Sequence, residues 1–557
     1  MSRLTRKIIS CGNNKGEHEM KRIIPILLAV TLLLALAACT STPTGEGAPA
    51  VENDETESAS TTQPEAQIDQ DEETGTDKKG GVLKIAIAND PDSLMVHKVR
   101  LGVDAVQPIY EGLMTYDETG EPVPNLAKSL TANSEELTYT IELNEGILFH
   151  DGSELTAEVC KWNLIKYRDE GVLGASYLSY LGDVEVTGNY TVVLHLTQWD
   201  SQMPYILSRQ MGYMQSQQAF ETHGEEYMAE HPVGTGPFVF DSWEHGVSIN
   251  FVRNENYWKG DVFLDGVELV IYSEALTAQA AIEAGEVDVW TAKDFDIANS
   301  LEEEGFTAYG SSVPYFSYAI HFHTADGPFA DLRVRQAVAY AIDREAIVSL
   351  LTAEKAVLSN QFVAPGNPYY NDQIDGYPYN IEKAKQLLAE AGYPDGFKTV
   401  ITTYNVGSQN TIALILIEML KEIGIELEMV DLDVASYVVK MDGWGEGLLN
   451  KAVTLDSGVG SQINGMYLPG RENGFGVGSF PQPAELLEAI EIGVNTSGQD
   501  SINGYKEAEK IIIDNEVMSV FFGVNRKITI TQTYVHDTGW GAIASFGNTL
   551  GEAWLEK

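Results

Sequence analysis

Cysteine is scarce in this chain, with three residues among 557. Two of them, Cys11 and Cys39, lie near the N-terminus, so only Cys160 remains in the rest of the chain. A single cysteine can form neither an intramolecular disulfide framework nor a cysteine metal cluster. The pattern excludes both from the main part of the chain, and we expect Cys160, on a predicted helix, to belong to the core.

Basic residues are also few, with 35 lysines and arginines against 82 aspartates and glutamates and a formal net charge of −47. The first 38 residues hold six of the basic residues and two of the acidic ones, so the remainder has 29 basic and 80 acidic residues. Its formal charge is therefore near −51. Such a charge argues against nucleic acid as a partner and against electrostatic adhesion to anionic lipid.

The motifs of common enzymes are lacking. The chain contains no His-Glu-x-x-His, no Gly-x-Ser-x-Gly and no Gly-x-x-x-x-Gly-Lys sequence. The glycine-rich stretch 458–465 has its last glycine two residues too far for a dinucleotide-binding fingerprint. We therefore interpret the chain as a protein that is not an enzyme and expect no cofactor. A secreted hydrolase stays open as a remote alternative, because paired carboxylates can occur anywhere among so many acids.

The N-terminus has the pattern of a secretory signal peptide. The basic pair Lys21-Arg22 precedes an apolar run over 23–38 that ends in small residues. We predict a signal peptide over residues 1–38, with Met20 as an alternative start. The following Cys39 resembles the cleavage-site cysteine of bacterial lipoproteins, which implies a lipid on its sulfur. An ordinary signal peptide with a chance cysteine stays open.

Residues 40–80 have the composition of a disordered linker. They contain no aromatic residue and carry eleven acids against Lys78 and Lys79. Such a segment buries too little apolar surface to offset the entropy of ordering its chain. We predict that 39–80 is a lipidated cysteine followed by a flexible acidic linker.

After this linker the sequence predicts interleaved strands and helices. An apolar run predicts a buried strand at 82–87, and alternating apolar residues predict another at 137–143. Amphipathic spacing predicts one helix over 331–350 and a second over 380–392, capped by Asn380. The pattern indicates an α/β protein, and its remaining length indicates two or more lobes.

Five groups of residues, in order along the chain, resemble the signature blocks of one family. They are IYEGL at 109–113 with PNLAKSL at 124–130, FHDG at 149–152 with LTA at 155–157, GTGPF at 234–238 with RNENYWKG at 253–260, FADLRVRQA through AIDR at 329–344, and KAKQLL through GYPDGF at 383–397. Together they are similar to the bacterial extracellular solute-binding proteins of family 5, the dipeptide, oligopeptide and nickel receptors of ABC importers.

We interpret these blocks as scaffold rather than as ligand site. Gly234, Gly236 and Pro237 suit a tight crossing turn, where a positive φ and a fixed φ are both useful. Tyr257 and Trp258 are expected to pack against other side chains rather than against solute.

The resemblance implies a two-lobed α/β clam shell of the periplasmic-binding-protein type (type II, cluster C-like), with a subdomain inserted in lobe I. It places the hinge strands near 315–324 and 520–527. The implied boundaries are lobe I at 81–122, 229–309 and 523–557, the inserted subdomain at 123–228, and lobe II at 310–522.

The same resemblance implies a receptor outside the cytoplasmic membrane, in the periplasm-equivalent space of the cell surface. Its partners would be a small solute, the permease subunits of an ABC importer and, through Cys39, the lipid of the membrane. We expect a monomer. A receptor that signals to a membrane sensor instead of feeding a transporter would use the same fold.

Peptide is the first choice of solute, although one family pattern is absent. Peptide receptors of the family resemble one another in a Trp-x-x-Asp-Tyr sequence whose aspartate pairs with the peptide's amine; here Trp444 is followed by Asp456 only twelve residues later. Asp456 is nevertheless a candidate for that role. Tyr315, Phe316 and Tyr318 near the predicted hinge, together with Trp444, are candidate ligand contacts, with lobe packing as their alternative role.

One weak metal-like feature is present. His321 and His323, two residues apart on a predicted strand, would point to the same face. No third ligand is visible by spacing, so we predict no metal site and keep these two residues as weak candidates. A receptor for nickel or a metal chelate, or for an oligosaccharide or opine, stays open within the same family.

Overall fold

The computed structural model describes residues that belong to one compact unit, Thr74–Lys557. The predicted signal peptide, Cys39 and nearly all of the predicted linker lie outside the described residues. Those residues are 78–117, 120–172, 175–292, 295–311, 316–352, 356–404, 408–454, 458–469, 479–541 and 550–556.

Seven strands form one mixed sheet, with β1 at its centre. β1 is parallel to β10 and β11, and the outer strands pair antiparallel. β1 occupies the predicted 82–87, and its Leu83 and Ile85 are fully buried. The strand order is β12 (Thr307–Gly310), β19 (Ile528–Thr531), β11 (Val289–Ala292), β1 (Val82–Ile87), β10 (Gly266–Ile271), β9 (Ser248–Arg253) and β8 (Phe238–Glu244); helices α5 (Ala275–Glu283) and α6 (Phe295–Glu303) join these strands.

A four-stranded antiparallel sheet is built from the segment between β1 and β8. Its order is β4 (Ala127–Asn133), β5 (Thr138–Leu143), β7 (Thr191–Leu196) and β6 (Leu181–Gly188). β5 confirms the strand predicted from alternation. Helix α1 (Ala157–Glu170) packs near this sheet and carries the fully buried Cys160.

The burial of Cys160 predicts an unreactive thiol. Removal from water raises the pKa of the Cys160 thiol to about 12, so the thiolate that reacts with reagents is hardly populated near neutral pH. In a chain with Cys11 and Cys39 replaced by serine, we expect no labelling by a thiol reagent at pH 8 until denaturant is added. Rapid labelling of the folded chain would contradict the buried placement.

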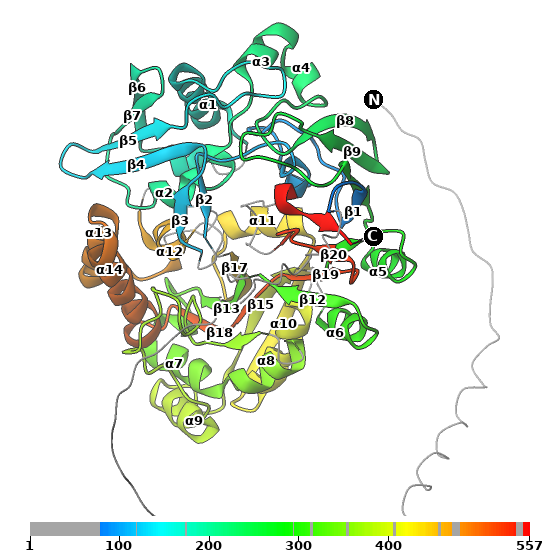
Figure 1. The fold of residues 1–557 in the computed structure, drawn as a ribbon. Coiled ribbons are helices and arrows are strands. Elements are labelled where there is room, and N and C mark those ends of the chain that lie inside the picture. The colour runs from blue at the N-terminus through cyan, green and yellow to red at the C-terminus, as the bar shows by residue number, and fades with distance from the viewer. Residues whose placement is uncertain are drawn as a thin grey trace, which may run out of the picture. The chain divides into compact units, whose positions relative to one another are not determined.

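A six-stranded sheet occupies the second half of the chain, with helices on both faces (Figure 1). Ile320 and Phe322 of one strand face the core shared with α7, α9 and α10, whereas Ala319 faces the core shared with α13 and α14. The strand order is β14 (Val357–Leu358), β18 (Ser519–Asn525), β13 (Phe316–Phe322), β17 (Leu448–Thr454), β15 (Phe397–Tyr404) and β16 (Ile425–Leu432), and the helices are α7 (Leu332–Ala341), α8 (Arg344–Thr352), α9 (Ile381–Glu390), α10 (Gln409–Lys421), α13 (Ala484–Asn495) and α14 (Gly498–Lys510).

Shorter elements complete the described residues. They are β2 (Met114–Tyr116), β3 (Pro122–Pro124), α2 (Met203–Leu207), α3 (Gln217–His223), α4 (Glu225–Met228), α11 (Val434–Asp442), α12 (Val459–Tyr467), β20 (Val535–His536) and β21 (Trp554–Leu555). Within the part of the chain that the structure describes, every helix is too short or too polar to cross a bilayer.

The single helix predicted over 331–350 is wrong, because two helices occupy that stretch. α7 ends at Ala341, Ile342 adopts an extended conformation, and α8 begins at Arg344. The Asp343 carboxylate accepts a hydrogen bond of 3.0 Å from the Ala346 amide and so caps a new helix. Helical spacing of apolar residues continues across the break, so periodicity alone predicted one helix where α7 and α8 are separate. The cap predicted at Asn380 is confirmed, since its side chain accepts from the Lys383 amide at 2.9 Å.

The chain passes between the two large sheets at two places. It leaves β12 of the seven-stranded sheet after Ser311 and enters β13 at Phe316, and it returns from β18 to β19 through Arg526 and Lys527. The Ser311 amide donates to the Lys527 carbonyl at 2.8 Å, and the Lys527 amide donates to Ser311 Oγ at 3.2 Å. These bonds tie the two crossings together. β13 and β18 lie in the predicted hinge segments.

The glycines of the GTGPF block serve close packing, and the positive φ predicted for them is wrong. Neither Gly234 nor Gly236 is among the residues with positive φ. A Cβ at Gly234 would lie 2.1 Å from the Ile109 carbonyl oxygen, and one at Gly236 would lie 2.6 Å from the same atom. Backbone approach from the 109–113 block therefore requires glycine at both positions.

A buried carboxylate joins three segments, 109–113, 234–238 and 253–260, that belong to two of the five family-like groups. Glu111, 8% exposed, accepts hydrogen bonds from Tyr257 Oη at 2.9 Å, Trp258 Nε1 at 2.7 Å and Thr235 Oγ1 at 3.1 Å. Lys259 Nζ lies 3.2 Å from the same carboxylate. Tyr257 and Trp258 thus make structural contacts, as interpreted from the sequence.

A second buried carboxylate, Glu509 of α14, predicts a pH dependence of stability. Glu509 is fully buried and accepts one hydrogen bond from the Phe362 amide at 2.8 Å; burial raises the pKa of Glu509 to about 8. The unfolded chain loses this proton at lower pH than the folded chain, so stability falls as pH rises from about 4.5 toward 8. Glu509→Gln should raise the free energy of unfolding by about 2 kcal/mol at pH 8, with little effect at pH 5. Denaturant titrations at both pH values check this, and equal effects at the two would contradict it.

Candidate functional site

A pocket of about 440 Å³ lies where the two large sheets approach each other. It is lined from the seven-stranded sheet by the carboxyl ends of the parallel strands β1 and β11, where α/β sheets commonly bind ligands. From the other sheet it is lined by β13, β15, β17 and β18. The lining residues are Ala86, Ile87, Ala88, Asn89, Arg100, Leu101, Gly102, Val103, Asp104, Gln107, Tyr272, Ser273, Ala275, Trp290, Thr291, Ala292, Phe316, Tyr318, Tyr404, Ser408, Gln409, Ala452, Asn525, Arg526, Lys527, Trp540 and Gly541.

Aromatic side chains from both sheets face this pocket. Trp290 and Trp540 come from one side, and Phe316, Tyr318 and Tyr404 come from the other. Asn525 Nδ2 donates a hydrogen bond of 2.8 Å to Tyr318 Oη, which fixes that ring. Burial raises the pKa of Tyr404 to about 12, and burial also raises the pKa of Tyr318, so both phenols are neutral at physiological pH. The site therefore offers flat apolar surfaces with neutral hydroxyl groups.

The structure brings two of the predicted ligand contacts to this pocket. Phe316 and Tyr318 of β13 both line it. Tyr315 and Asp456 lie outside the described residues. Trp444 is 3% exposed, and its Nε1 donates to the Glu446 carbonyl at 2.8 Å. Its contact with solute stays a prediction that this burial does not favour.

Several lining residues carried no signal in the sequence. Trp290 is the second residue of β11, and Trp540 lies in a loop some 250 residues later, so only the fold brings them together. Tyr404 ends β15 and packs against Tyr437 with ring centroids 4.5 Å apart. None of these residues belongs to a recognisable motif, and a strand-end position is the one feature that could have indicated Tyr404.

The two histidines considered as metal ligands have separate surroundings. His321 is fully buried, with its Nδ1 2.7 Å from Ser519 Oγ, and desolvation lowers the pKa of His321 to about 3. His323 lies beyond the end of β13, with Nδ1 3.5 Å from an Asp326 carboxylate oxygen and its ring against Trp444. Among the described residues no group of three histidine, cysteine or acidic side chains could hold a metal ion.

A second contact joins residues 199–205, which follow strand β7 of the four-stranded sheet, to the helices of the six-stranded sheet. Ser201 donates from its amide to the Val494 carbonyl at 3.2 Å and from Oγ to the Gly493 carbonyl at 2.8 Å. Trp199 Nε1 donates to the Thr496 carbonyl at 3.4 Å. Gln202 and Tyr205 both hydrogen bond with Tyr369. We call this set of interactions the 199–205 contact.

Two glycines at the start of α12 make room for this contact. A Cβ at Gly460 would lie 2.7 Å from Gln202 Nε2, and one at Gly458 would lie 3.3 Å from the Tyr205 ring. The glycine-rich stretch 458–465, which does not match the dinucleotide fingerprint, therefore packs against the side chains of Gln202 and Tyr205.

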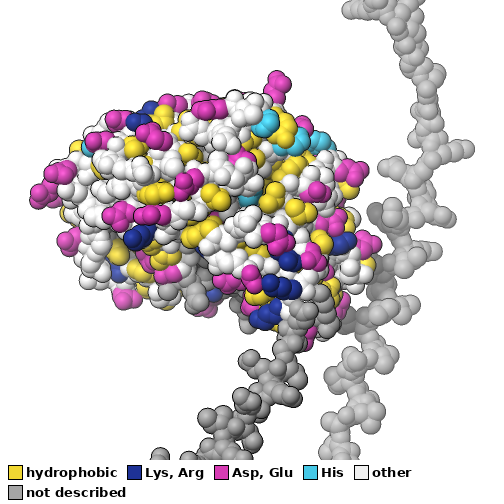
Figure 2. Space-filling view, turned by 45° about the horizontal axis from the view of Figure 1, so that its top comes forward, with side chains coloured by type: hydrophobic (Ala, Val, Ile, Leu, Met, Phe, Trp, Pro, Cys, Tyr) yellow, Lys and Arg dark blue, Asp and Glu magenta, His cyan; other side chains and the backbone are white. Residues whose placement is uncertain are grey.

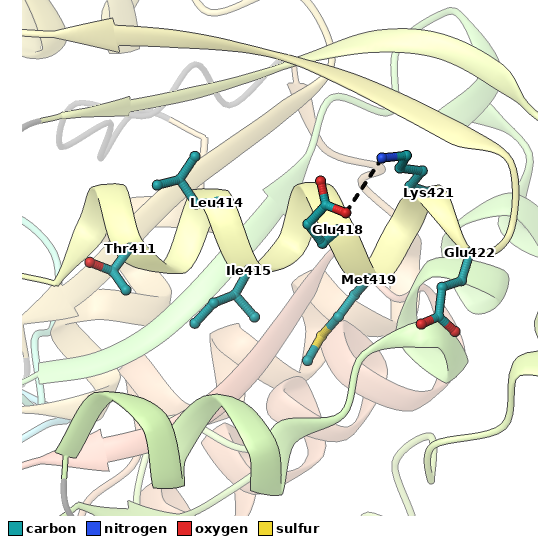
Figure 3. A pocket seen from close by; sticks show the side chains of 7 residues that line it. All are labelled: Thr411, Leu414, Ile415, Glu418, Met419, Lys421 and Glu422. Carbon is teal, nitrogen blue, oxygen red and sulfur yellow. Dashed lines mark hydrogen bonds and ion pairs between the residues drawn. The ribbon is translucent and has the colours of Figure 1, made fainter. Parts of the chain in front are cut away.

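Another pocket, of about 670 Å³, lies on the outer side of α10 (Figure 3). All of its lining residues belong to α10 or to Glu422, the residue that follows it, and Glu418 pairs with Lys421 at 3.4 Å. Among the described residues no second element lines this surface, so it does not enclose a solute as the pocket between the sheets can. The pocket between the two large sheets is therefore the candidate site.

Comparison with known proteins identifies a family that matches the chain. The model of the "Bacterial extracellular solute-binding proteins, family 5 Middle" matches residues 121–458. The glutathione-binding protein GsiB of Escherichia coli O1:K1 is 29% identical over 341 residues, which cover 60% of this chain and 66% of the relative. The chain thus spans just under two thirds of that relative's length.

Solved structures with the same fold align with this chain over nearly their whole length. The periplasmic binding protein DppA of Helicobacter pylori, in complex with the peptide STSA, has a TM-score of 0.72 at 22% identity and covers 86% of this chain and 99% of its own. NikA of Brucella suis, in complex with Fe(III)-EDTA, has a TM-score of 0.76 at 19% identity and covers 85% of this chain and all of its own. These likenesses confirm the predicted α/β clam-shell fold.

Proposed function

Because this chain belongs to the bacterial extracellular solute-binding proteins of family 5, we propose that it is the solute-binding receptor of an ABC importer. It binds a small solute reversibly outside the cytoplasmic membrane and presents it to a permease. The observation that carries this proposal is the pocket of about 440 Å³ lined by both large sheets. A site between two bodies joined by two crossings can enclose a whole solute and report its presence by closing.

We assign the lobes on the same basis. Lobe I comprises 81–122, 229–309 and 523–557 around the seven-stranded sheet, and 123–228 is its inserted subdomain. Lobe II comprises 310–522 around the six-stranded sheet. The bonds between Ser311 and Lys527 support a hinge at the two crossings.

Peptide is the solute class that we propose. The volume of about 440 Å³ is in the range of pockets that take small organic ligands, and the aromatic walls suit amide planes and apolar side chains. The named relative binds glutathione, a peptide, and DppA was solved with STSA. A metal chelate or opine remains the second candidate, because arginine and lysine beside aromatic rings also suit an anionic chelate.

We further propose that lipid on Cys39 holds the receptor at the membrane. Cys39→Ser should release the protein into the soluble fraction, whereas the unmodified chain should sediment with membranes. Retention of the Cys39→Ser protein in the membrane fraction would contradict the lipid anchor.

A thermal-shift screen of the Cys39→Ser chain tests the solute class. The panel consists of di- to hexapeptides, glutathione, oligosaccharides, octopine and nickel with histidine. A ligand at a hundred times its dissociation constant adds about 2.7 kcal/mol to the free energy of unfolding. A shift with peptides alone would support the proposal, and a shift with sugars or chelates alone would keep the receptor and replace its solute.

A further inference from the structure

The pocket inverts the charge balance of the chain. Three basic residues and one acidic residue line it, although the whole chain has 35 basic and 82 acidic residues. Acidic side chains are spread over the visible face in Figure 2, with few basic ones among them. Positive charge gathered in the cavity of so acidic a protein points to a negatively charged group on the solute.

The charged side chains of the pocket differ in how they are engaged. Arg100 Nε lies 3.4 Å from an Asp92 carboxylate oxygen, so part of its charge is balanced. The Asp104 carboxylate accepts a hydrogen bond of 2.8 Å from Gln107 Nε2. Arg526 is exposed and makes no hydrogen bond or ion pair with any residue that the structure describes.

The backbone around Arg526 is held on both sides. Asn525 before it is buried and donates to Tyr318, and Lys527 after it is tied to Ser311. The aliphatic stem of Arg526 packs beside Gly310, where a Cβ would lie 3.5 Å from Arg526 Cδ. The backbone that carries the Arg526 guanidinium is therefore held in place at the hinge, where both lobes border the pocket.

We propose that the solute carries a carboxylate that is bound by Arg526, with Lys527 adding positive charge. This inference rests on the proposed function and names the chemical class of its solute: a peptide with a free C-terminus or another carboxylate-bearing solute. The planar guanidinium matches a carboxylate with two parallel hydrogen bonds. Lys527 contributes a point charge one residue away.

The long-range electrostatic field of the protein would favour a peptide amide over the free acid. Conversion of a peptide's C-terminal carboxylate to an amide removes a negative charge, so a strongly acidic protein should attract the amide better at a distance. Salt screens such long-range attraction, whereas a direct contact in the pocket is screened less. A preference for the free acid therefore reports a local contact.

Calorimetric titration of the Cys39→Ser chain tests the proposal with trialanine, glutathione, their C-terminal amides, and octopine as a non-peptide acid. The free acids should bind at least about tenfold more tightly than their amides, as expected for a charge-assisted pair. Arg526→Gln should lower affinity for the acids to that for the amides and leave the amides unchanged. Lys527→Gln should have a smaller effect. Lys398→Gln, which removes an exposed lysine paired with Glu426 away from the pocket, is the matched control.

The outcomes separate this proposal from the proposed function. Peptides that bind equally as acid and amide would overturn the carboxylate contact and leave a peptide receptor. Binding of octopine alone, lost in Arg526→Gln, would uphold the carboxylate contact and overturn the peptide assignment. Unchanged affinity of Arg526→Gln for a bound acid, or no binding of any acid, would overturn the carboxylate contact.

Discussion

Ser201→Arg is expected to weaken solute binding at least about tenfold while leaving the unliganded protein as stable as before. In the structure Ser201 bonds the Val494 and Gly493 carbonyls across the 199–205 contact, and we propose that this contact forms when the lobes close. An arginine cannot occupy that space, so the closed form becomes less populated. Apparent affinity falls in proportion to the population of the binding-competent form. Titration calorimetry with any hit of the thermal-shift screen measures this effect.

A matched variant separates closure from general damage. Thr187→Arg adds the same side chain to β6 of the four-stranded sheet, at an exposed position outside the 199–205 contact. Its affinity should equal that of the unsubstituted chain. Equal affinities for Ser201→Arg and Thr187→Arg would show that the 199–205 contact plays no part in closure.

Glu111→Ala is expected to lower the free energy of unfolding by about 3 kcal/mol, because it leaves Lys259 and three hydrogen-bond donors without their buried partner. The carboxylate connects the blocks at 109–113, 234–238 and 253–260, so its loss affects several packed segments. Urea titration followed by tryptophan fluorescence gives the magnitude.

The control for Glu111 is an exposed glutamate with a single partner. Glu185 lies 3.0 Å from His195 on the surface of the four-stranded sheet, and Glu185→Ala should change stability by less than about 0.5 kcal/mol. A loss for Glu111→Ala as small as this would mean that the buried carboxylate does not hold the blocks together.

Local elements were predictable where one pattern dominated. β1 is a continuous apolar run, and Asn380 precedes a clean amphipathic helix, so both were found. The break at Ile342 and Asp343 was missed because apolar spacing continues through it while a side-chain cap restarts the helix. At Gly234 and Gly236 the residue type was informative, but its cause was a neighbouring backbone that the sequence does not show.

The candidate site was predictable only in part. Phe316 and Tyr318 could be proposed because they lie in a predicted hinge strand, and both line the pocket. Trp290, Trp540 and Arg526 belong to segments whose proximity depends on strand order, which composition and spacing do not encode. Gly458 and Gly460 are a similar case, because they accommodate side chains from a segment more than 200 residues earlier.

The most direct test of the account is to fill the pocket and measure binding. Ser273 is an exposed residue at the pocket, so Ser273→Trp should fold normally and occupy part of the 440 Å³. Ser242→Trp, at an exposed position of β8 outside the pocket, is its control. By calorimetry with the best hit of the screen, we predict at least about a tenfold loss of affinity for Ser273→Trp and none for Ser242→Trp. Equal affinity of the two variants would place the solute elsewhere and contradict the account.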